Sequence, residues 1–244
     1  MTLNDWMVLG VAPFVGSFVG VLIRRLPAGA PVVWSRSACP SCQAVLAPRD
    51  LVPLLSYLWQ RGVCRYCASR IDPFHPRVEL ATLGIAVWAV FAGPGDRLIA
   101  DCVLGWTLLT LAWIDAGTML LPDVLTLPLL VAGFGEAWLL DPESLPDRGI
   151  GAALGWVCFA GLAWVWRRVR GIEALGQGDA KLLAAGGAWL GWQALPQVIV
   201  LASVAGIVAT VIRSRGRVSA TEALAFGPWL ALAIWLTRFY VVDL

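Results

Sequence analysis

Residues 111–123 read LAWIDAGTMLLPD and place two aspartates inside strongly apolar sequence. Asp115 ends one apolar run, and Asp123 lies just inside the next. A carboxylate beside hydrocarbon is costly, so such an acid either reaches water or is retained for function. The stretch therefore indicates one membrane helix ending and another beginning, with acids at the boundary.

The composition is that of an integral membrane protein. Hydrophobic residues make up 59% of the 244 positions and charged residues only 14%, whereas soluble domains are about one quarter charged. The 14 tryptophans suit a protein with two membrane interfaces. The first apolar run lacks a basic leader and a small-residue cleavage site, so it does not resemble a signal peptide. We predict an all-α polytopic fold with about eight spans: 5–23, 78–94, 98–114, 120–140, 149–166, 180–194, 196–212 and 223–242.

Basic residues predict the orientation of these spans. Most of the 18 Lys and Arg fall in three connections, namely Arg24, Arg25, Arg36, Arg49, Arg61, Arg65, Arg70 and Arg77; Arg167, Arg168, Arg170 and Lys181; and Arg213, Arg215 and Arg217. Eight spans place all three connections on one side, which the positive-inside rule makes cytoplasmic, with both termini outside. This requires a reversal near Pro196, by two short helices or a re-entrant hairpin.

The longest polar stretch, residues 26–77, contains two CxxC pairs. Cys39 and Cys42 form the first pair, and Cys64 and Cys67 form the second. Two such pairs suit one tetrahedral Zn²⁺, and a metal would stabilise an insert too small for a large core. Disulfides, a redox role and idle thiols are the alternatives, but cytoplasmic thiols stay reduced. We expect Cys102 and Cys158 to be small buried hydrophobic residues and His75 to be interfacial.

Five acids lie in or beside apolar runs: Asp101, Asp115, Asp123, Glu136 and Asp179. In the predicted topology Asp115 and Asp179 reach the same, cytoplasmic face. Asp101 and Glu136 fall nearer the opposite face. Asp123 follows Pro122 at a helix start, where a capping role suffices. Asp115 and Asp179 are therefore the candidate pair.

The sequence around Asp179 favours a wet cleft. Gly176 and Gly178 permit unusual dihedrals and close approach, and broken helices at membrane depth occur where they line a cavity. Two adjacent carboxylates share one proton, so one can activate water while the other polarises a peptide carbonyl. Serine and zinc hydrolase motifs are absent from the sequence.

At these residues the chain resembles the bacterial prepilin peptidases, or type IV leader peptidases. The resemblance covers nearly the whole chain and both CxxC pairs. It includes residues 16–27 (GSFVGVLIRRLP), 53–57 (PLLSY), 77–80 (RVEL), 115–123 (DAGTMLLPD), 176–183 (GQGDAKLL) and 226–228 (FGP). Asp115 and Asp179 match the catalytic pair of that family. Gly20 departs from it, because the family often has asparagine there.

The resemblance implies removal of basic leaders from prepilins or pseudopilins at the cytoplasmic face of the bacterial inner membrane. It also implies N-methylation of the exposed residue with S-adenosylmethionine. The sequence shows no glycine-rich nucleotide fingerprint, so the residues that would bind this cofactor stay unassigned. We expect lipid contacts and no nucleic-acid partner.

The expected division of the chain is a first transmembrane helix (1–25), a cytoplasmic zinc-binding insert (26–77) and a multi-span aspartyl peptidase domain (78–244). Two rival functions remain open. One is a proton-coupled transporter, which midplane acids and inverted repeats would favour. The other is a non-catalytic scaffold whose zinc insert docks a secretion partner. Substrates could belong to type IV pili or to type II secretion.

Overall fold

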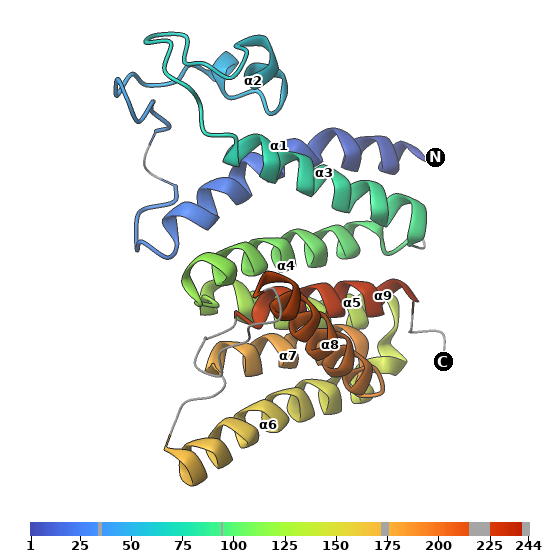
Figure 1. Ribbon diagram of the computed structural model, residues 1–244. Helices are drawn as coiled ribbons and strands as arrows, with labels where there is room; N and C mark the ends of the chain where they lie inside the picture. The colour runs from blue at the N-terminus through green and yellow to red at the C-terminus, as the bar shows by residue number, and fades with distance from the viewer. Residues whose placement is uncertain (34–35, 94, 172–175, 215–224, 241–244) are drawn as a thin grey trace. The chain divides into compact units, whose positions relative to one another are not determined.

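The computed structural model describes residues 1–33, 36–93, 95–171, 176–214 and 225–240 (Figure 1). Across these ranges the chain is helical, with isolated bridges instead of strands. The α-helices are α1 (Leu3–Arg25), α2 (Leu55–Trp59), α3 (Phe74–Ala92), α4 (Leu98–Thr118), α5 (Asp123–Leu140), α6 (Leu145–Arg170), α7 (Gln177–Leu190), α8 (Leu195–Arg213) and α9 (Gly227–Tyr240). Short 3₁₀ turns occupy Pro48–Asp50 and Pro142–Ser144. The predicted basic residues Arg215 and Arg217 lie outside the described ranges.

The all-α membrane fold is confirmed, and each predicted span overlaps a helix in the described part of the chain. Residues 94, 223, 224, 241 and 242 of the predicted spans lie outside the described ranges. Within the described ranges, five helical segments are long and apolar enough to cross a bilayer: Leu3–Arg25, Leu98–Thr118, Asp123–Leu140, Pro142–Arg170 and Leu195–Arg213. Helices α7 and α9 have 14 residues each, or about 21 Å of helix against a hydrocarbon core of about 30 Å. Both are largely buried among their neighbours. The predicted span 180–194 is shifted by three to four residues toward the C-terminus relative to α7.

The chain forms two compact units, residues 1–106 and 107–244. In the first unit α1 packs along α3 (Figure 1). Gly16 makes this packing close, because a Cβ added there would lie 2.6 Å from the Cα of Glu79. The buried Thr82 hydroxyl donates to the carbonyl oxygen of Ala12 at 3.0 Å. The proposed boundaries at residues 25 and 77 stay predictions.

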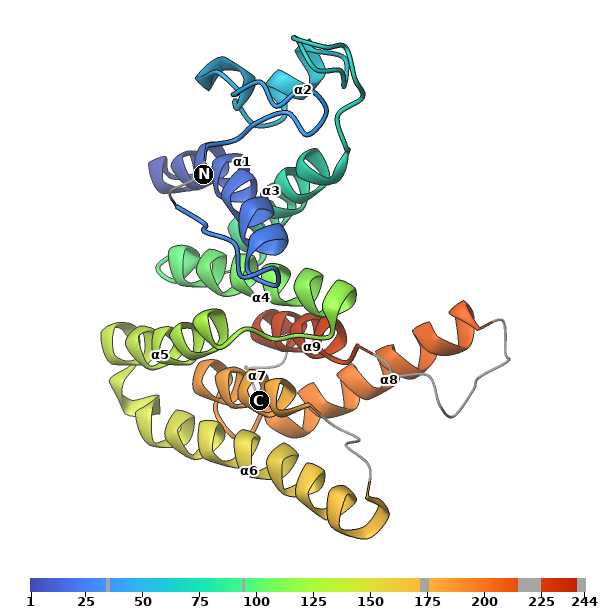
Figure 2. The ribbon, with the colours of Figure 1, turned by 90° about the vertical axis from the view of Figure 1, so that its left-hand side faces the viewer.

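In the second unit α7 is the central helix. It packs against α5, α6 and α9 (Figure 2), and every residue from Asp179 to Leu190 except Lys181 is buried. Small side chains allow this, since a Cβ on Gly187 would lie 2.3 Å from the backbone of Gly151 in α6. The start of α7 is therefore held inside the unit.

The predicted reversal before Pro196 takes the form of two helices. Helix α7 ends at Leu190, and Gly191 follows with a φ of 83°, which favours glycine. Helix α8 begins at Leu195 with Pro196 in its first turn, where no intrahelical N–H is needed. With 19 residues, α8 is longer than the short helix expected.

A buried ionic cluster ties α5, α6 and α9 together. Glu136 accepts hydrogen bonds from Arg148 and, at 2.9 Å, from Arg238. All three side chains are at least 96% buried. Arg148 and Arg238 lie on the predicted side with few basic residues, and their pairing with Glu136 gives them a structural role.

Two cysteines lie outside the insert. Cys102 is buried in α4, as expected. Cys158 is exposed on α6, so its predicted burial is wrong. The apolar neighbours of Cys158 on this face of α6 suit contact with lipid.

Candidate active site and metal centre

Asp115 lies in the last turn of α4, in the second compact unit. The helix continues through Thr118, one turn beyond the predicted end of the span. The Asp115 residue is only 5% exposed. Its Oδ2 accepts a hydrogen bond of 2.9 Å from the backbone N–H of Gly227, the first residue of α9. Helices α4 and α9 thus meet at this carboxylate.

Asp179 lies in the first turn of α7 and is 9% exposed. Gly176 precedes the helix with φ −71° and ψ 143°, which any residue adopts, so unusual dihedrals are not the reason for this glycine. At both Gly176 and Gly178, a neighbouring side chain lies so close to the backbone that it leaves little room for a Cβ. A Cβ on Gly176 would lie 3.2 Å from Asp179 Oδ2, and one on Gly178 would lie 2.8 Å from the Cβ of Leu121.

The structure brings the two predicted acids to one site. The charge of Asp115 acts directly on the carboxyl group of Asp179. The contact of Gly178 with Leu121 also places the connection between α4 and α5 on the first turn of α7. Two buried carboxyl groups from distant parts of the chain therefore lie near each other, as proton sharing would require.

Asp123 has a different role from the one expected. Pro122 occupies the N-cap position of α5, and Asp123 is the first helical residue. The Asp123 carboxylate binds Lys181 Nζ through both oxygens, at 2.6 and 2.8 Å. The predicted helix start is correct, but an ion pair to α7 replaces the predicted cap.

The other acids lie apart from this site. Asp101 is buried in the first turn of α4, 14 residues before Asp115, which is about 21 Å of helix. Glu136 belongs to the ionic cluster with Arg148 and Arg238. Their exclusion from the candidate pair agrees with the sequence analysis.

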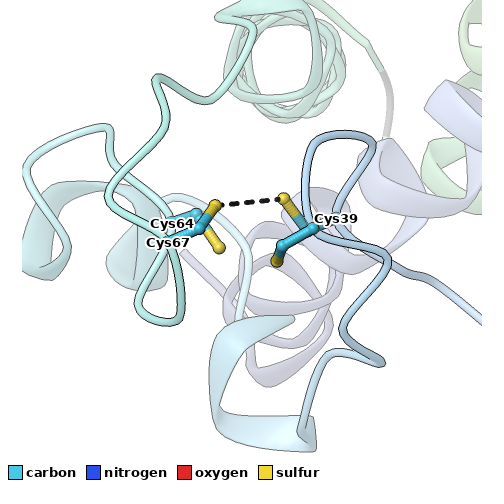
Figure 3. A group of neighbouring side chains, drawn as sticks. Cys39, Cys64 and Cys67 are labelled. Carbon is cyan, nitrogen blue, oxygen red and sulfur yellow. Dashed lines mark hydrogen bonds between the residues drawn. The ribbon is translucent and has the colours of Figure 1, made fainter.

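The four insert cysteines form one cluster. The sulfur atoms of Cys39, Cys42, Cys64 and Cys67 all lie within 4.8 Å of one another. Figure 3 shows the Cys39 and Cys67 sulfurs facing each other, and their separation is 3.9 Å. Zn–S bonds of about 2.3 Å in a tetrahedron give sulfur separations of about 3.8 Å. The cluster can therefore hold a metal ion, and its donor set suits zinc.

Both cysteine pairs share one backbone pattern. Gln43 N–H donates to the carbonyl of Cys39 at 2.9 Å, and Ala68 N–H donates to that of Cys64 at the same distance. Gln43 and Ala68 have φ values of 58° and 56°. An antiparallel bridge closes each turn, Ala38 with Val45 and Val63 with Arg70. Each pair thus forms the same knuckle, and the two knuckles face each other across the sulfurs.

Local donors favour the thiolate at one cysteine of each knuckle, whereas desolvation and the neighbouring thiols raise the pKa of Cys42 to about 11. Hydrogen bonds from the backbone of Cys42 and Ser41 lower the pKa of the Cys39 thiol to about 6. The Ser69 hydroxyl and backbone lower the pKa of Cys67. Each knuckle therefore offers one sulfur that ionises readily, which suits metal binding. All six cysteines are free thiols.

The residues that hold the insert together were not apparent from the sequence. Asp50, with a side chain only 2% exposed, binds Arg65 Nε at 2.9 Å and accepts hydrogen bonds from Ala47, Gln60 and Tyr66. Asp50 follows Pro48-Arg49 in polar sequence, and nothing local distinguishes it from a surface acid. It links the chain between the two knuckles to the second knuckle.

Two further contacts attach the insert to its helices. Glu79 of α3 is 6% exposed and accepts a hydrogen bond of 2.8 Å from the N–H of Leu54. Arg24 at the end of α1 pairs with Asp72 and stacks on the Phe74 ring. The motifs at residues 53–57 and 77–80 therefore contact each other, through the hydrogen bond from Leu54 to Glu79.

His75 lies outside the cysteine cluster, in the first turn of α3. A Cβ on Gly20 would lie 2.7 Å from His75 Nδ1. The glycine that departs from the family pattern thus makes room for this ring. His75 belongs to α3, and its ring lies against Gly20 of α1, so the prediction of an interfacial histidine fits a position at the contact between these two helices.

Comparisons with known proteins cover both halves of the chain. Residues 9–92 match the Bacterial Peptidase A24 N-terminal domain, and residues 102–211 match the Type IV leader peptidase family. Several similar curated proteins are named "Prepilin leader peptidase/N-methyltransferase". That of Dickeya chrysanthemi is 40% identical over 90% of this chain and 86% of its own length. That of Aeromonas hydrophila is 38% identical over 94% of this chain and 91% of its own length. That of Klebsiella pneumoniae is 45% identical over 78% of this chain and 86% of its own length. No solved structure matches.

Proposed function

Because this chain belongs to the type IV leader peptidase family, we propose that it is an aspartic endopeptidase that removes basic leaders from prepilins or pseudopilins. The observation that carries the proposal is the pairing of two buried carboxyl groups, Asp115 of α4 and Asp179 of α7, at one site. The rest of the chemistry follows from this pair.

The two carboxyl groups divide the work of peptide hydrolysis. The ionised member removes a proton from water as the water attacks the scissile carbonyl carbon. The protonated member donates a hydrogen bond to the carbonyl oxygen, which gains negative charge in the tetrahedral intermediate. Proton transfer to the leaving amine then breaks the C–N bond and regenerates the singly protonated pair. The Gly227 N–H, bonded to Asp115, fixes the orientation of that carboxyl group.

The site is suited to a substrate that lies across a membrane boundary. Asp115 and Asp179 sit near the ends of apolar helices. Arg167 in the basic last turn of α6 lines one pocket together with Gly176 and Lys181 at the start of α7. We place this end of the helices at the cytoplasmic face of the inner membrane by the positive-inside rule. A basic leader then stays in the cytoplasm, while the apolar segment after the cleavage site lies beside the enzyme's helices.

The insert supports this function as a zinc-stabilised module. Cys39, Cys42, Cys64 and Cys67 would hold one Zn²⁺, which links the two knuckles. Contacts of Glu79 with Leu54 and of Arg24 with Asp72 would transmit that order to α1 and α3. The metal would act structurally, because four thiolates leave no open position for substrate.

Methyl transfer is the second part of the proposal. Relatives named as N-methyltransferases share 38 to 45% identity with this chain. S-adenosylmethionine would supply the methyl group to the amine that cleavage exposes. The residues that would bind this cofactor stay unassigned.

The decisive experiment replaces each aspartate by asparagine, which keeps the shape and removes the proton sharing. We expect Asp115→Asn and Asp179→Asn each to lower cleavage of a prepilin at least a hundredfold. Asp147→Asn is the matched control, because Asp147 bonds Trp192 and Gln193 beyond the far end of α7. Membrane insertion and melting temperature should stay normal in all three. Cleavage at the normal rate by either dyad variant would refute the mechanism.

A further inference from the structure

Lys181 is the only lysine in the sequence, and the other 17 of its 18 Lys and Arg residues are arginines. It follows Asp179 by two residues in the first turns of α7. Its Nζ contacts both carboxylate oxygens of Asp123, at 2.6 and 2.8 Å. Asp123 in turn follows Asp115 by eight residues, at the start of α5. The ion pair thus joins the two chain segments that carry the candidate catalytic acids.

A second contact joins the same two segments. Leu121 lies so close to Gly178 that an added Cβ would be 2.8 Å from the leucine side chain. Leu121 and Asp123 are the residues on either side of Pro122. Gly178 directly precedes Asp179, and Lys181 follows it by two residues. The connection after α4 is therefore fastened to the start of α7 at two points, one apolar and one ionic.

We expect Lys181 to affect the site by holding the backbone of α7 in place, and not by an interaction of its charge with Asp179. Side chains two residues apart on a helix point in different directions, so Lys181 and Asp179 do not face each other. The Lys181 ammonium is already held by Asp123. The effect of the pair on catalysis must therefore come from where it holds the first turn of α7.

The ion pair is too exposed to be a principal support of the fold. The side chains of Lys181 and Asp123 are 30% and 55% exposed, and pairs of that kind contribute little to global stability. Helix α7 is secured by its buried residues from Ala180 to Leu190. Loss of the pair should therefore loosen the alignment of the acids without unfolding the protein.

We propose that Asp123 and Lys181 form a positioning pair that aligns Asp115 with Asp179 for proton sharing. The proposal rests on the proposed function, because it assumes that these two acids are the catalytic dyad. It assigns neither Asp123 nor Lys181 a contact with substrate. It predicts that charge complementarity at these two positions matters and that the identity of the residue at each does not.

The test compares single replacements with a charge exchange in the purified full-length enzyme. Asp123→Asn and Lys181→Gln should each lower kcat about two- to fivefold, with KM and melting temperature unchanged. A fivefold loss corresponds to about 1 kcal/mol, the most that an exposed pair supplies. Lys181→Arg and the exchange Asp123→Lys with Lys181→Asp should restore kcat to within about twofold of the parent. Asp147→Asn again serves as the control for loss of an interhelical carboxylate contact.

Two independent measurements separate positioning from general stability. Salt at about 1 M reduces the Debye length to about 3 Å, so kcat of the parent should fall toward that of Lys181→Gln, which should not respond. Acetylation should lower kcat of the parent and leave Lys181→Gln unaffected, because no other side chain in the protein is a lysine.

The outcomes distinguish this inference from the proposed function. Normal kcat in both single variants, or failure of both Lys181→Arg and the charge exchange to recover it, overturns the positioning pair while Asp115→Asn and Asp179→Asn remain inactive. Normal cleavage by Asp115→Asn or Asp179→Asn overturns the dyad and the positioning pair together.

Discussion

The backbone N–H of Gly227 donates to Oδ2 of Asp115 at 2.9 Å, and no side chain fits between them. A Cβ added to Gly227 would lie 2.7 Å from that oxygen and 2.9 Å from the carboxyl carbon. The first turn of α9 therefore approaches the candidate catalytic acid closely enough to fix one of its oxygens. This explains the short motif at residues 226–228 without giving any of its side chains a chemical role.

Gly227→Ala should lower cleavage of a prepilin by about tenfold to a hundredfold. The added methyl group must displace either the Asp115 carboxylate or the start of α9, and misplacements of about 1 Å at a reacting group have effects of that size. The measurement is kcat at saturating substrate. Gly135→Ala is the control, since a Cβ there meets nothing within 4 Å on the exposed side of α5. A normal kcat in Gly227→Ala would show that the close contact is not needed for activity.

Metal analysis should find about one zinc per chain in protein purified without chelator. Replacing Cys39 by serine should abolish zinc retention, because three thiolates cannot complete the tetrahedron. The mutant insert should also become sensitive to proteolysis, since the two knuckles lose their link. Cys158→Ser is the matched control, because this exposed cysteine of α6 lies outside the cluster. Zinc bound equally by both variants, or by neither and not by the parent, would contradict the metal centre.

Glu136→Gln should destabilise the protein strongly while leaving the dyad intact. The change leaves the buried guanidinium groups of Arg148 and Arg238 without their shared carboxylate, and breaking such a pair costs about 3–5 kcal/mol. We expect the melting temperature in detergent to fall by about 10 °C. Glu143→Gln, at an exposed position just before α6, should change it little. Equal melting temperatures for the two variants would show that the buried cluster does not stabilise the bundle.

Local sequence was sufficient to predict the helices and the candidate pair. Long apolar runs specify helices in a membrane whatever their partners, since the backbone must satisfy its own hydrogen bonds there. The positions of Asp115 and Asp179 at helix ends followed from the lengths of those runs. The common depth of the two acids in the membrane stays a prediction from counting spans.

Contacts between distant segments could not be read from the sequence. The bonds of Gly227 to Asp115 and of Leu54 to Glu79 join residues 112 and 25 positions apart, and no periodicity specifies them. Asp123 was misjudged for the same reason. Its place after Pro122 suggests a cap, and only the packing of α5 against α7 brings Lys181 to it. The predicted span at 180–194 begins and ends three to four residues too late, because only the structure shows that Gly191, with a φ of 83°, follows the end of α7.

The last prediction concerns the proton that Asp115 and Asp179 would share. The mechanism needs one ionised carboxylate to accept a proton from water and one carboxylic acid to donate to the scissile carbonyl. In acid both groups are protonated and no base remains. In alkali both are ionised and no donor remains. Only the singly protonated pair would be active, so the mechanism requires the two groups to titrate as a coupled pair.

Accordingly, kcat/KM should follow a bell-shaped curve against pH, with each limb changing by about tenfold per pH unit because one proton is involved on each side. The measurement is initial cleavage rate in nanodiscs over a wide pH range, with zinc content and folding checked at every point so that loss of the insert is not mistaken for titration of the dyad. A second substrate with different ionisable residues near the cleavage site should give the same limbs, because the free enzyme sets them. Lys181→Gln should lower the whole curve without moving it if that residue acts by position alone. A rate that stays flat from mildly acidic to strongly alkaline pH would show that no shared proton is required, and Asp115 would then have only a structural role as the acceptor of the Gly227 N–H.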